Sequence, residues 1–359
     1  MAAVDSKSTW DRFAFRNRDF VRGKIDSGQN RGKSFTVPEF IAERYKPTSY
    51  FASGGCGLLL KGKDIKTDAE VLIKSTLEYG EADYAKWRDE DGFVVQLKKT
   101  RQQLQTERRV MVWLKNRGCN SVPNPIDYVF DLNPRLAEPY STSEGTDTWT
   151  FSDEVMLSSE PFLIMEFVHG RMLTDIIGNG IDERRSVGIL REVCHVFEVL
   201  HKPMSLASRT FQLAYQDLKP DNVMVGAHDA VRLIDFGGCR VSVNGTISAH
   251  GAFTPGYCPP ECDSTSEIKP SADAFSVGAM LYHMITGQNP GDLLKNSLAS
   301  AVRKSVRFDD WDWNRLQQRA SRQTVEMIKQ CVAERPTERP ADGQQLSQML
   351  SKMEGASCI

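Results

Sequence analysis

The alternation of hydrophobic and polar residues predicts a strand-rich first half of the chain. Residues 49–60 and 70–75 have the pattern of strands, and the first stretch encloses the glycine cluster SGGCG. Two later apolar runs, 126–130 and 161–167, are also typical of strands. Residues 133–160 are rich in Ser, Thr, Glu and Pro, which predicts a surface insert between these two runs.

A helical period starts near Leu104. Leu104, Glu107, Met111 and Leu114 are spaced 3, 4 and 3 residues apart, which places Glu107 on an apolar stripe. A buried carboxylate is costly unless it is paired with a cation, so the pattern indicates either a pair or an edge position open to solvent. Two further helices are predicted by the spacing of Leu190, Cys194, Phe197 and His201, and of Phe275, Gly278, Tyr282 and Ile285.

Strands followed by helices predict an α+β protein in two parts. Residues 1–45 are polar and of mixed charge, and we interpret them as an N-terminal extension. Because acids are interspersed among the bases, a solvated tail is favoured over a contact with nucleic acid or lipid.

Composition limits the classes of function. The chain has 359 residues, of which 40% are hydrophobic, enough for a large core. A net charge of -2 argues against wholesale attraction to nucleic acid or acidic membranes. The eight cysteines form no C-x-x-C pair, so neither a zinc site nor a disulfide scaffold is predicted. Without a signal-peptide core or a membrane-spanning run, we expect a soluble, cytoplasmic protein.

Two polar constellations lie in the strand-rich half. The segment ASGGCG, residues 52–57, is placed between strands, where small residues let backbone N–H groups approach phosphate oxygens; a plain hairpin is the alternative. Lys74 closes the apolar strand VLIK, where a lysine usually only extends to solvent. Paired with Glu107, it would instead be held in place to clamp phosphates.

Two more constellations lie in the helical half. The segment LAYQDLKPDNVMV, residues 213–225, spaces Asp217, Lys219 and Asn222 so that one loop aims three polar groups at one point, as a phosphate and its metal ion would need. A solvated turn is the alternative. In LIDFGG, Asp235 follows an apolar run, and its carboxylate is suited to holding Mg²⁺.

The order of these motifs resembles the eukaryotic-like (Hanks-type) serine/threonine protein kinase family. Glycine loop, lysine, glutamate, DLKPDN, DFG and PPE follow one another as in that family, over residues 44–350 or so. The resemblance implies a two-lobed α+β fold, with an N-terminal antiparallel sheet plus one helix and a mainly helical C-terminal lobe. The implied boundaries are an extension at 1–45, an N-lobe at 46–168 with the insert near 133–160, a C-lobe at 169–353 and a tail at 354–359.

The resemblance also implies a role for each matching residue. Lys74 is similar to the lysine that holds the α- and β-phosphates, with Glu107 as its partner on the helix. Asp217 is similar to the catalytic base, and Lys219 to the lysine that neutralises the transferring phosphoryl group. Asn222 and Asp235 are similar to the ligands of Mg²⁺, for which Mn²⁺ is an alternative. The other ATP-binding positions are implied to be Ser53, Gly54, Gly55, Cys56, Gly57, Leu59, Leu72, the gatekeeper Met165, and the hinge residues Glu166 and Val168.

Further matches concern structure and substrate class. Asp273 resembles the aspartate that ties the central helix to the catalytic loop, and Arg339 the arginine that pairs with Glu261. Lys219, and Thr254 seven residues before Glu261, resemble the serine/threonine branch of the family. We therefore expect a serine/threonine kinase that acts on a protein substrate, without a membrane or nucleic-acid partner. The alternatives are a pseudokinase scaffold and a kinase of small molecules.

The chain departs from the family pattern in both lobes. Ala52 replaces the first glycine of the loop, and Leu72 replaces a smaller alanine above adenine, which lowers the roof of the pocket. The spacing from Lys74 to Glu107 is long, which leaves room for an extra helix at 79–92 and makes Glu90 the alternative partner.

A further departure lies beside the catalytic aspartate, where Gln216 stands in place of arginine. A neutral amide cannot offset the charge of a phosphate. Unless Arg240 substitutes for that arginine, we expect phosphorylation of the following segment to have little effect on turnover. The candidate positions in this segment are Ser242, Thr246 and Ser248.

Overall fold

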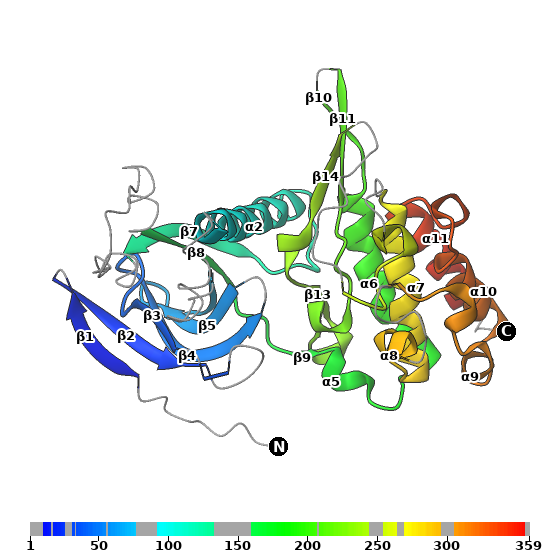
Figure 1. Cartoon of the computed structure of the whole chain (residues 1–359), viewed down its shortest axis with the longest axis horizontal. Coiled ribbons are helices and arrows are strands. Elements are labelled where there is room, and N and C mark those ends of the chain that lie inside the picture. Colours follow the sequence, from blue (N-terminus) through cyan, green and yellow to red (C-terminus); the bar gives the residue numbers. More distant parts are fainter. Residues whose placement is uncertain are drawn as a thin grey trace. The chain divides into compact units, whose positions relative to one another are not determined.

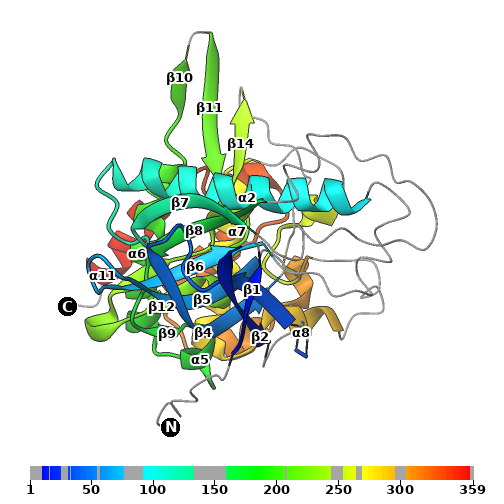
Figure 2. The same cartoon turned by 90° about the vertical axis from the view of Figure 1, so that its left-hand side faces the viewer.

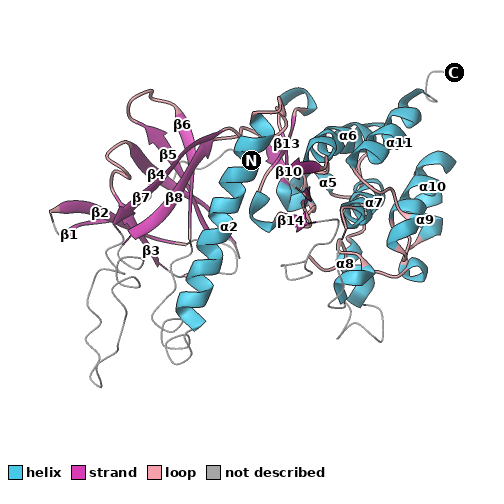
Figure 3. Cartoon of the chain, turned by 90° about the horizontal axis from the view of Figure 1, so that it is seen from above, coloured by secondary structure: helices cyan, strands magenta, loops and turns pink. Residues whose placement is uncertain are grey.

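The computed structural model describes residues 10–15, 17–25, 31–32, 34–54, 57–76, 92–132, 159–206, 208–243, 254–263, 269–295 and 305–355. The chain divides into two compact units: unit 1 comprises Met1–Arg109 and Asn124–Phe167, and unit 2 comprises Val110–Pro123 and Val168–Ile359. Strands predominate in unit 1 and helices in unit 2 (Figure 3). Unit 1 ends at Phe167. The domain boundaries given above stay predictions.

Unit 1 contains a five-stranded antiparallel sheet with the order β4-β5-β6-β8-β7 (Figure 1). The sequence predicted strands in these segments, and that prediction is confirmed. Their bounds are β4 Tyr45–Gly54, β5 Gly57–Asp64, β6 Glu70–Ser75, β7 Pro125–Leu132 and β8 Ser159–Glu166. Helix α2 runs from Gly92 to Lys115, so its residues up to Arg109 belong to this unit.

The extension is not a solvated tail. Residues 11–38 contain β1 (Asp11–Phe15), β2 (Arg18–Lys24) and β3 (Ser34–Pro38), which form a separate antiparallel sheet. Phe20 and Phe35 are fully buried, and residues of β2 and β3 share a hydrophobic core with β5, β6 and β8. The expectation of a polar arm was wrong here because the apolar residues among the charges are buried: in β2 the adjacent Phe20 and Val21 are both buried, although charged residues flank them.

Charged side chains fix this small sheet to the large one. Arg18 of β2 donates to the Asp131 carboxylate of β7, with Nη2 2.8 Å from Oδ2. The same oxygen accepts the backbone N–H of Ala42 at 2.7 Å. Asp131 is 6% exposed, so this contact replaces the water that its carboxylate loses on folding.

Unit 2 is organised around two helices, α6 (Glu183–Leu200) and α7 (Ser271–Thr286). α7 is buried along its length except at His283, and the predicted apolar positions of α6 are buried as well, so both predicted helices are confirmed. Asp182 caps α6 by accepting the backbone N–H of Arg185 at 2.9 Å. The other helices of the unit are α5 Thr174–Ile177, α8 Pro290–Lys295, α9 Trp313–Gln317, α10 Arg322–Cys331 and α11 Gly343–Gly355.

Two small sheets complete unit 2 and carry the loops of the candidate site. One has the order β13-β12-β9 and the other β10-β11-β14. In the second sheet the β10–β11 hairpin extends away from the helices of the unit (Figures 1 and 2), and it fills the long connection between His201 and Asp217. The strands are β9 Arg171–Met172, β10 Met204–Leu206, β11 Arg209–Ala214, β12 Val223–Val225, β13 Val231–Leu233 and β14 Arg240–Val243.

The helices of the described ranges show no membrane-spanning character. None of them combines the length and the apolar character that a bilayer crossing requires.

Candidate active site

One face of the large sheet in unit 1 carries the residues predicted to contact a nucleotide. Lys74 lies opposite Leu59 of β5 and Leu163 of β8, and Leu72 lies opposite Met165. Directly opposed residues of an antiparallel pair point to the same face, so these side chains share one side of the sheet. The intervening residues of β5 and β6 are buried in the core on the other side.

Lys74 and Glu107 form the expected ion pair. The Lys74 Nζ lies 2.7 Å from the Glu107 Oε2, and the two side chains are 5% and 3% exposed. Glu107 lies between the buried residues Leu104 and Met111 of α2, as the period of the helix predicted. The alternative partner Glu90 lies outside the described residues. Because neither charge is in water, each depends on the other for compensation.

The glycine turn joins β4 to β5. Gly57 has φ +144°, and a Cβ atom placed on it would lie 2.2 Å from the Ser75 carbonyl oxygen, so the turn requires glycine there. Ala52 pairs with Leu59 in the β4–β5 ladder, so the methyl group that replaces the first glycine is compatible with the hairpin. Gly54 ends β4, and the Ser53 hydroxyl lies 3.1 Å from the Tyr50 hydroxyl. Gly55 and Cys56, at the tip, lie outside the described residues.

The predicted hinge begins at the end of β8. Glu166 donates its backbone N–H to the Asn124 carbonyl at 2.9 Å, and its Oε2 accepts the N–H of Asn124 at 3.0 Å. The side chain of Glu166 is therefore engaged by the segment before β7. Val168 begins unit 2.

In unit 2, the Asp217 carboxylate is held by three side chains. Thr254 donates its hydroxyl to Oδ1 at 2.7 Å, and Lys219 Nζ lies 2.9 Å from Oδ2. Asn222 donates from Nδ2 to the Asp217 carbonyl at 2.7 Å and to its Oδ2 at 3.1 Å. These contacts fix the direction of the carboxylate, and the ammonium of Lys219 stands beside it.

Asp273 of α7 holds the backbone of the same loop. Its carboxylate is fully buried and accepts the N–H groups of Tyr215 and Gln216, each at 2.7 Å. It also bonds the His201 Nε2 at 2.9 Å. Gln216 has φ +67°, a conformation that is costly for a residue with a side chain, and the two bonds to Asp273 compensate this strain. The predicted tie between the central helix and the loop is confirmed.

Asp235 lies next to this loop. The Ile234 N–H donates to the Asn222 carbonyl at 2.9 Å, and a Cβ on Gly238 would lie 3.5 Å from the Asp217 Cβ, so the two loops are in contact. Asp235 has φ +60°, and its side chain accepts the N–H of Gly237. Because Asn222 uses its Nδ2 for Asp217, its Oδ1 is the atom left for a ligand. An amide oxygen and a carboxylate on adjoining loops fit the oxygen ligands that Mg²⁺ prefers.

Gln216 differs from the family residue in its contacts as well as its charge. It is 7% exposed, and neither atom of its side-chain amide has a hydrogen-bond partner among the described residues. Ser242 lies on β14, whose backbone pairs with Gln212 of β11, so this strand joins the segment after Asp235 to the one before Asp217. Thr246 and Ser248 lie outside the described residues, and the small effect of phosphorylation stays a prediction.

Two residues at the site were not predicted as site residues. Thr254 contacts Asp217 and also lies 3.1 Å from Lys219 Nζ, although the sequence had marked it only by its spacing from Glu261. His201 accepts the N–H of Gly343 at its Nδ1, at 3.0 Å, and thereby connects α11 to Asp273. In the sequence, the helical spacing of His201 from Leu190, Cys194 and Phe197 was the one sign that its side chain is buried.

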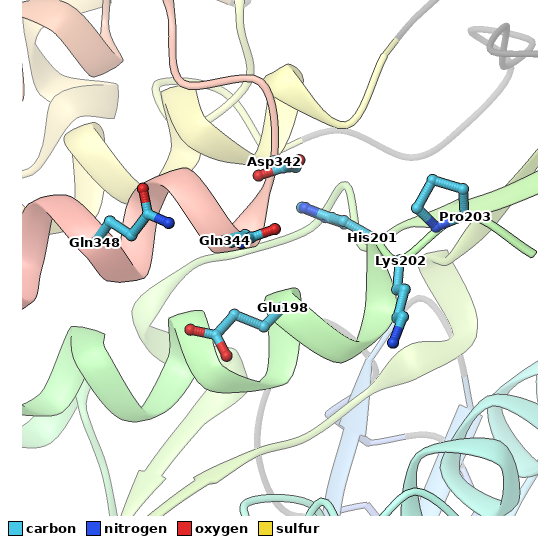
Figure 4. A pocket seen from close by; sticks show the side chains of 7 residues that line it. All are labelled: Glu198, His201, Lys202, Pro203, Asp342, Gln344 and Gln348. Carbon is cyan, nitrogen blue, oxygen red and sulfur yellow. The ribbon is translucent and has the colours of Figure 1, made fainter.

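A polar hollow of about 440 Å³ lies between the end of α6 and the start of α11. Figure 4 shows that charged and amide side chains, among them Glu198, Lys202 and Asp342, surround it. His201 also lines it, but both ring nitrogens of His201 already have partners. No residue of the catalytic loop lines this hollow, so we assign it no part in the chemistry.

The burial of His283 is expected to make folding stability depend on pH. The Tyr257 hydroxyl lies 2.6 Å from the His283 Nδ1. Burial lowers the pKa of His283 from 6.5 to about 4, against the opposing charges of Asp292 and Asp221. Between these values the unfolded chain binds a proton that the folded chain does not, so folding stability decreases as the pH falls below 6.5.

We expect the free energy of unfolding to drop by about 1 kcal/mol between pH 7.5 and pH 5.5 because of His283. Urea denaturation of the wild type and of His283→Gln at both pH values measures this contribution as the difference between their pH slopes. Equal slopes in the two proteins would show that His283 does not couple folding to pH.

A family comparison matches the protein kinase domain over residues 146–352, more than half of the chain. Serine/threonine-protein kinase A of Synechocystis sp. is 30% identical over 137 residues, 36% of this chain and 26% of that protein. Serine/threonine-protein kinase PknB of Mycobacterium leprae is 23% identical over 279 residues, 76% of this chain and 37% of that protein. Serine/threonine-protein kinase PknL of Mycobacterium bovis is 24% identical over 254 residues, 70% of this chain and 51% of that protein.

This chain thus spans between about a quarter and a half of the length of these relatives. The family match begins after Lys74 and Glu107, whose assignment therefore rests on the ion pair in unit 1. The catalytic loop, Asp235 and Glu261 all lie within the match. The chain belongs to the protein kinase domain family.

Proposed function

We propose that the chain transfers the γ-phosphate of ATP to serine and threonine hydroxyls of a protein substrate. The observation that carries the proposal is the arrangement of Asp217, Lys219 and Thr254, in which a carboxylate is fixed beside an ammonium and a threonine hydroxyl. The names of the relatives, which are serine/threonine-protein kinases, support it.

In this proposal each side chain acts on a defined group. Asp217 orients the acceptor hydroxyl and accepts its proton, and Lys219 neutralises charge on the phosphoryl group as it moves. Lys74, held by Glu107, binds the α- and β-phosphates of ATP. Asn222 and Asp235 would hold Mg²⁺. When bound, Mg²⁺ stabilises the negative charge that develops on the phosphate oxygens.

The two other functions that the sequence left open are less well supported. A pseudokinase would be favoured by the loss of a group that touches phosphate, metal or proton, yet Lys74, Asp217, Asn222 and Asp235 are all present. A kinase of small molecules does not need the segment that brings Thr254 to Asp217. We also propose a reducing, cytoplasmic setting, because the described cysteines Cys119, Cys194 and Cys331 are free thiols.

The test is to incubate the protein with Mg·ATP and a mixture of peptides that carry Ser, Thr or Tyr, and to map the products by mass spectrometry. We expect phosphoserine and phosphothreonine, and none with Asp217→Asn. Products confined to tyrosine would contradict the proposed specificity, and the absence of phosphopeptides would contradict the activity.

A further inference from the structure

Helix α2 and the edge strand β7 form an exposed surface of aromatic and cationic side chains in unit 1. Tyr128 and Phe130 are two residues apart on β7 and so point to the same face; their rings meet edge to face with centroids 5.5 Å apart. Phe130 is 58% exposed, which is unusual for a phenylalanine. The Arg108 guanidinium of α2 lies over the Tyr128 ring, 5.8 Å from its centroid. We call these residues, with Arg109, the α2–β7 surface.

The charge of this surface is not balanced within the part of the chain that the structure describes. Arg108 and Arg109 are exposed, both act electrostatically on the Tyr128 phenol, and no carboxylate pairs with either in the described ranges. Glu107 is the one acidic residue of α2, and it is buried in its pair with Lys74. The surface therefore suits a ligand that combines carboxylates with aromatic side chains.

The edge of β7 is poorly suited to the addition of another strand. Asp127 accepts the N–H of Tyr128 at 2.8 Å, and Asp131 accepts the N–H of Leu132 at 2.7 Å. These two amides are therefore occupied by side chains and cannot pair with a further strand. This favours a ligand of the α2–β7 surface that is held by its side chains.

A segment with this chemistry lies next to the surface in the chain. Residues 146–155, outside the described residues, read TDTWTFSDEV and contain three acids, two aromatic residues and no base. They belong to the connection that leaves β7 at Leu132 and enters β8 at Ser159. Phe130 lies opposite Pro161, so both ends of the connection are two residues from that pair.

The connection is long enough to reach the surface. The phenylalanine at position 151 is eight positions before Ser159, and these eight residue steps span up to about 28 Å when extended. Arg101 of α2 donates to the Ser159 carbonyl and fastens this end of the connection beside the helix. A ligand tethered at both ends has an effective concentration in the millimolar range, so a modest affinity is sufficient.

We propose that the α2–β7 surface binds the chain's own segment 146–155, through Arg108 and Arg109 to its carboxylates and through Phe130 and Tyr128 to its aromatic rings. This binding is independent of phosphoryl transfer, so its test does not depend on the proposed activity.

The test uses a fluorescent peptide with the sequence of residues 146–155 and measures anisotropy. In one variant of the full chain, residues 134–157 are replaced by a short Gly-Ser linker. We expect this variant to bind the peptide at least about tenfold more tightly than the wild type, whose own segment competes. Adding Arg108→Glu and Arg109→Glu to the variant should weaken binding about tenfold or more, whereas Lys66→Glu, an exposed cation elsewhere in unit 1, should not.

A second variant avoids the deletion. Replacing Asp147, Asp153 and Glu154 by their amides in the full chain should release the surface, so that this variant binds the wild-type peptide as the deletion variant does. Equal binding by wild type and both variants, or binding that survives Arg108→Glu and Arg109→Glu, would overturn the proposal. A dimer that the amide substitutions dissociate would assign the segment to a second copy of the chain and would equally overturn it.

Discussion

Replacing Asp217 by asparagine is expected to lower turnover by a factor of about 10³ or more, with little change in stability. The amide oxygen can take the place of the oxygen that Lys219 contacts at 2.9 Å, and the amide NH2 then faces the Thr254 hydroxyl, which can accept instead of donating across 2.7 Å, so the loop keeps its geometry. What is lost is the negative charge that orients the acceptor hydroxyl and takes its proton. Asp235→Asn is expected to have a similar effect through the loss of a metal ligand.

Lys74 requires a different design because its partner is buried. Lys74→Met alone removes the cation that pairs with the Glu107 carboxylate, which is 3% exposed, and this lowers the stability of unit 1. The same substitution also removes the contact of Lys74 with phosphate. The double variant Lys74→Met, Glu107→Leu should recover stability but not activity. Recovery of stability without recovery of activity would separate the role of Lys74 in catalysis from its role in folding.

The measurements are steady-state kinetics with a serine peptide, thermal denaturation and nucleotide binding. Asp229→Asn is a matched control, since Asp229 is an exposed carboxylate of unit 2 that pairs with Arg185 away from the catalytic loop. It should retain turnover within about a factor of two. Wild-type turnover in Asp217→Asn would remove this residue from the mechanism.

The sequence predicted the parts of the site that follow from a helical period or from residues close together in the chain. The period of α2 placed Glu107 on the buried stripe, and a burial cost that only a cation offsets pointed to the pair with Lys74. Asp217, Lys219 and Asn222 are within six residues, so the turn that Pro220 begins is enough to bring them together.

Contacts between distant segments were harder to predict. Thr254 meets Asp217 across 37 positions, and only the folded path of the chain brings the two together. The β10–β11 hairpin has a three-residue strand, too short for a clear alternation, and its sheet is completed by β14 from beyond Asp235. In the extension, the adjacent Phe20 and Val21 lie among charged residues, so β2 lacks the regular alternation that would have predicted a strand, and their burial follows only from packing in the folded chain.

Replacing Arg339 by alanine is expected to lower the free energy of unfolding by about 3–5 kcal/mol, because the Glu261 carboxylate, whose side chain is 10% exposed, loses this cation. The predicted pair with Glu261 is confirmed and bidentate, with Nη1–Oε1 2.7 Å and Nη2–Oε2 2.9 Å. Arg339 also donates to the carbonyls of Ala333 and Glu334, and its guanidinium lies 5.2 Å from the centre of the Phe275 ring. One side chain therefore joins the PPE segment, the end of α10 and the central helix α7.

Urea denaturation at pH 7.5 measures this loss, and Arg335→Ala is the matched control. The Arg335 side chain is 80% exposed and its pair with Glu338 is 3.5 Å long, so its removal should cost less than about 0.5 kcal/mol. Arg339→Lys keeps the charge but neither the bidentate contact nor the fit over Phe275, and it should lie between the two. If Arg339→Ala lost activity while its unfolding curve matched that of the wild type, the pair would act on the substrate segment and not on the fold. The full burial of the Arg339 side chain predicts the opposite, that activity falls only as far as the folded fraction does.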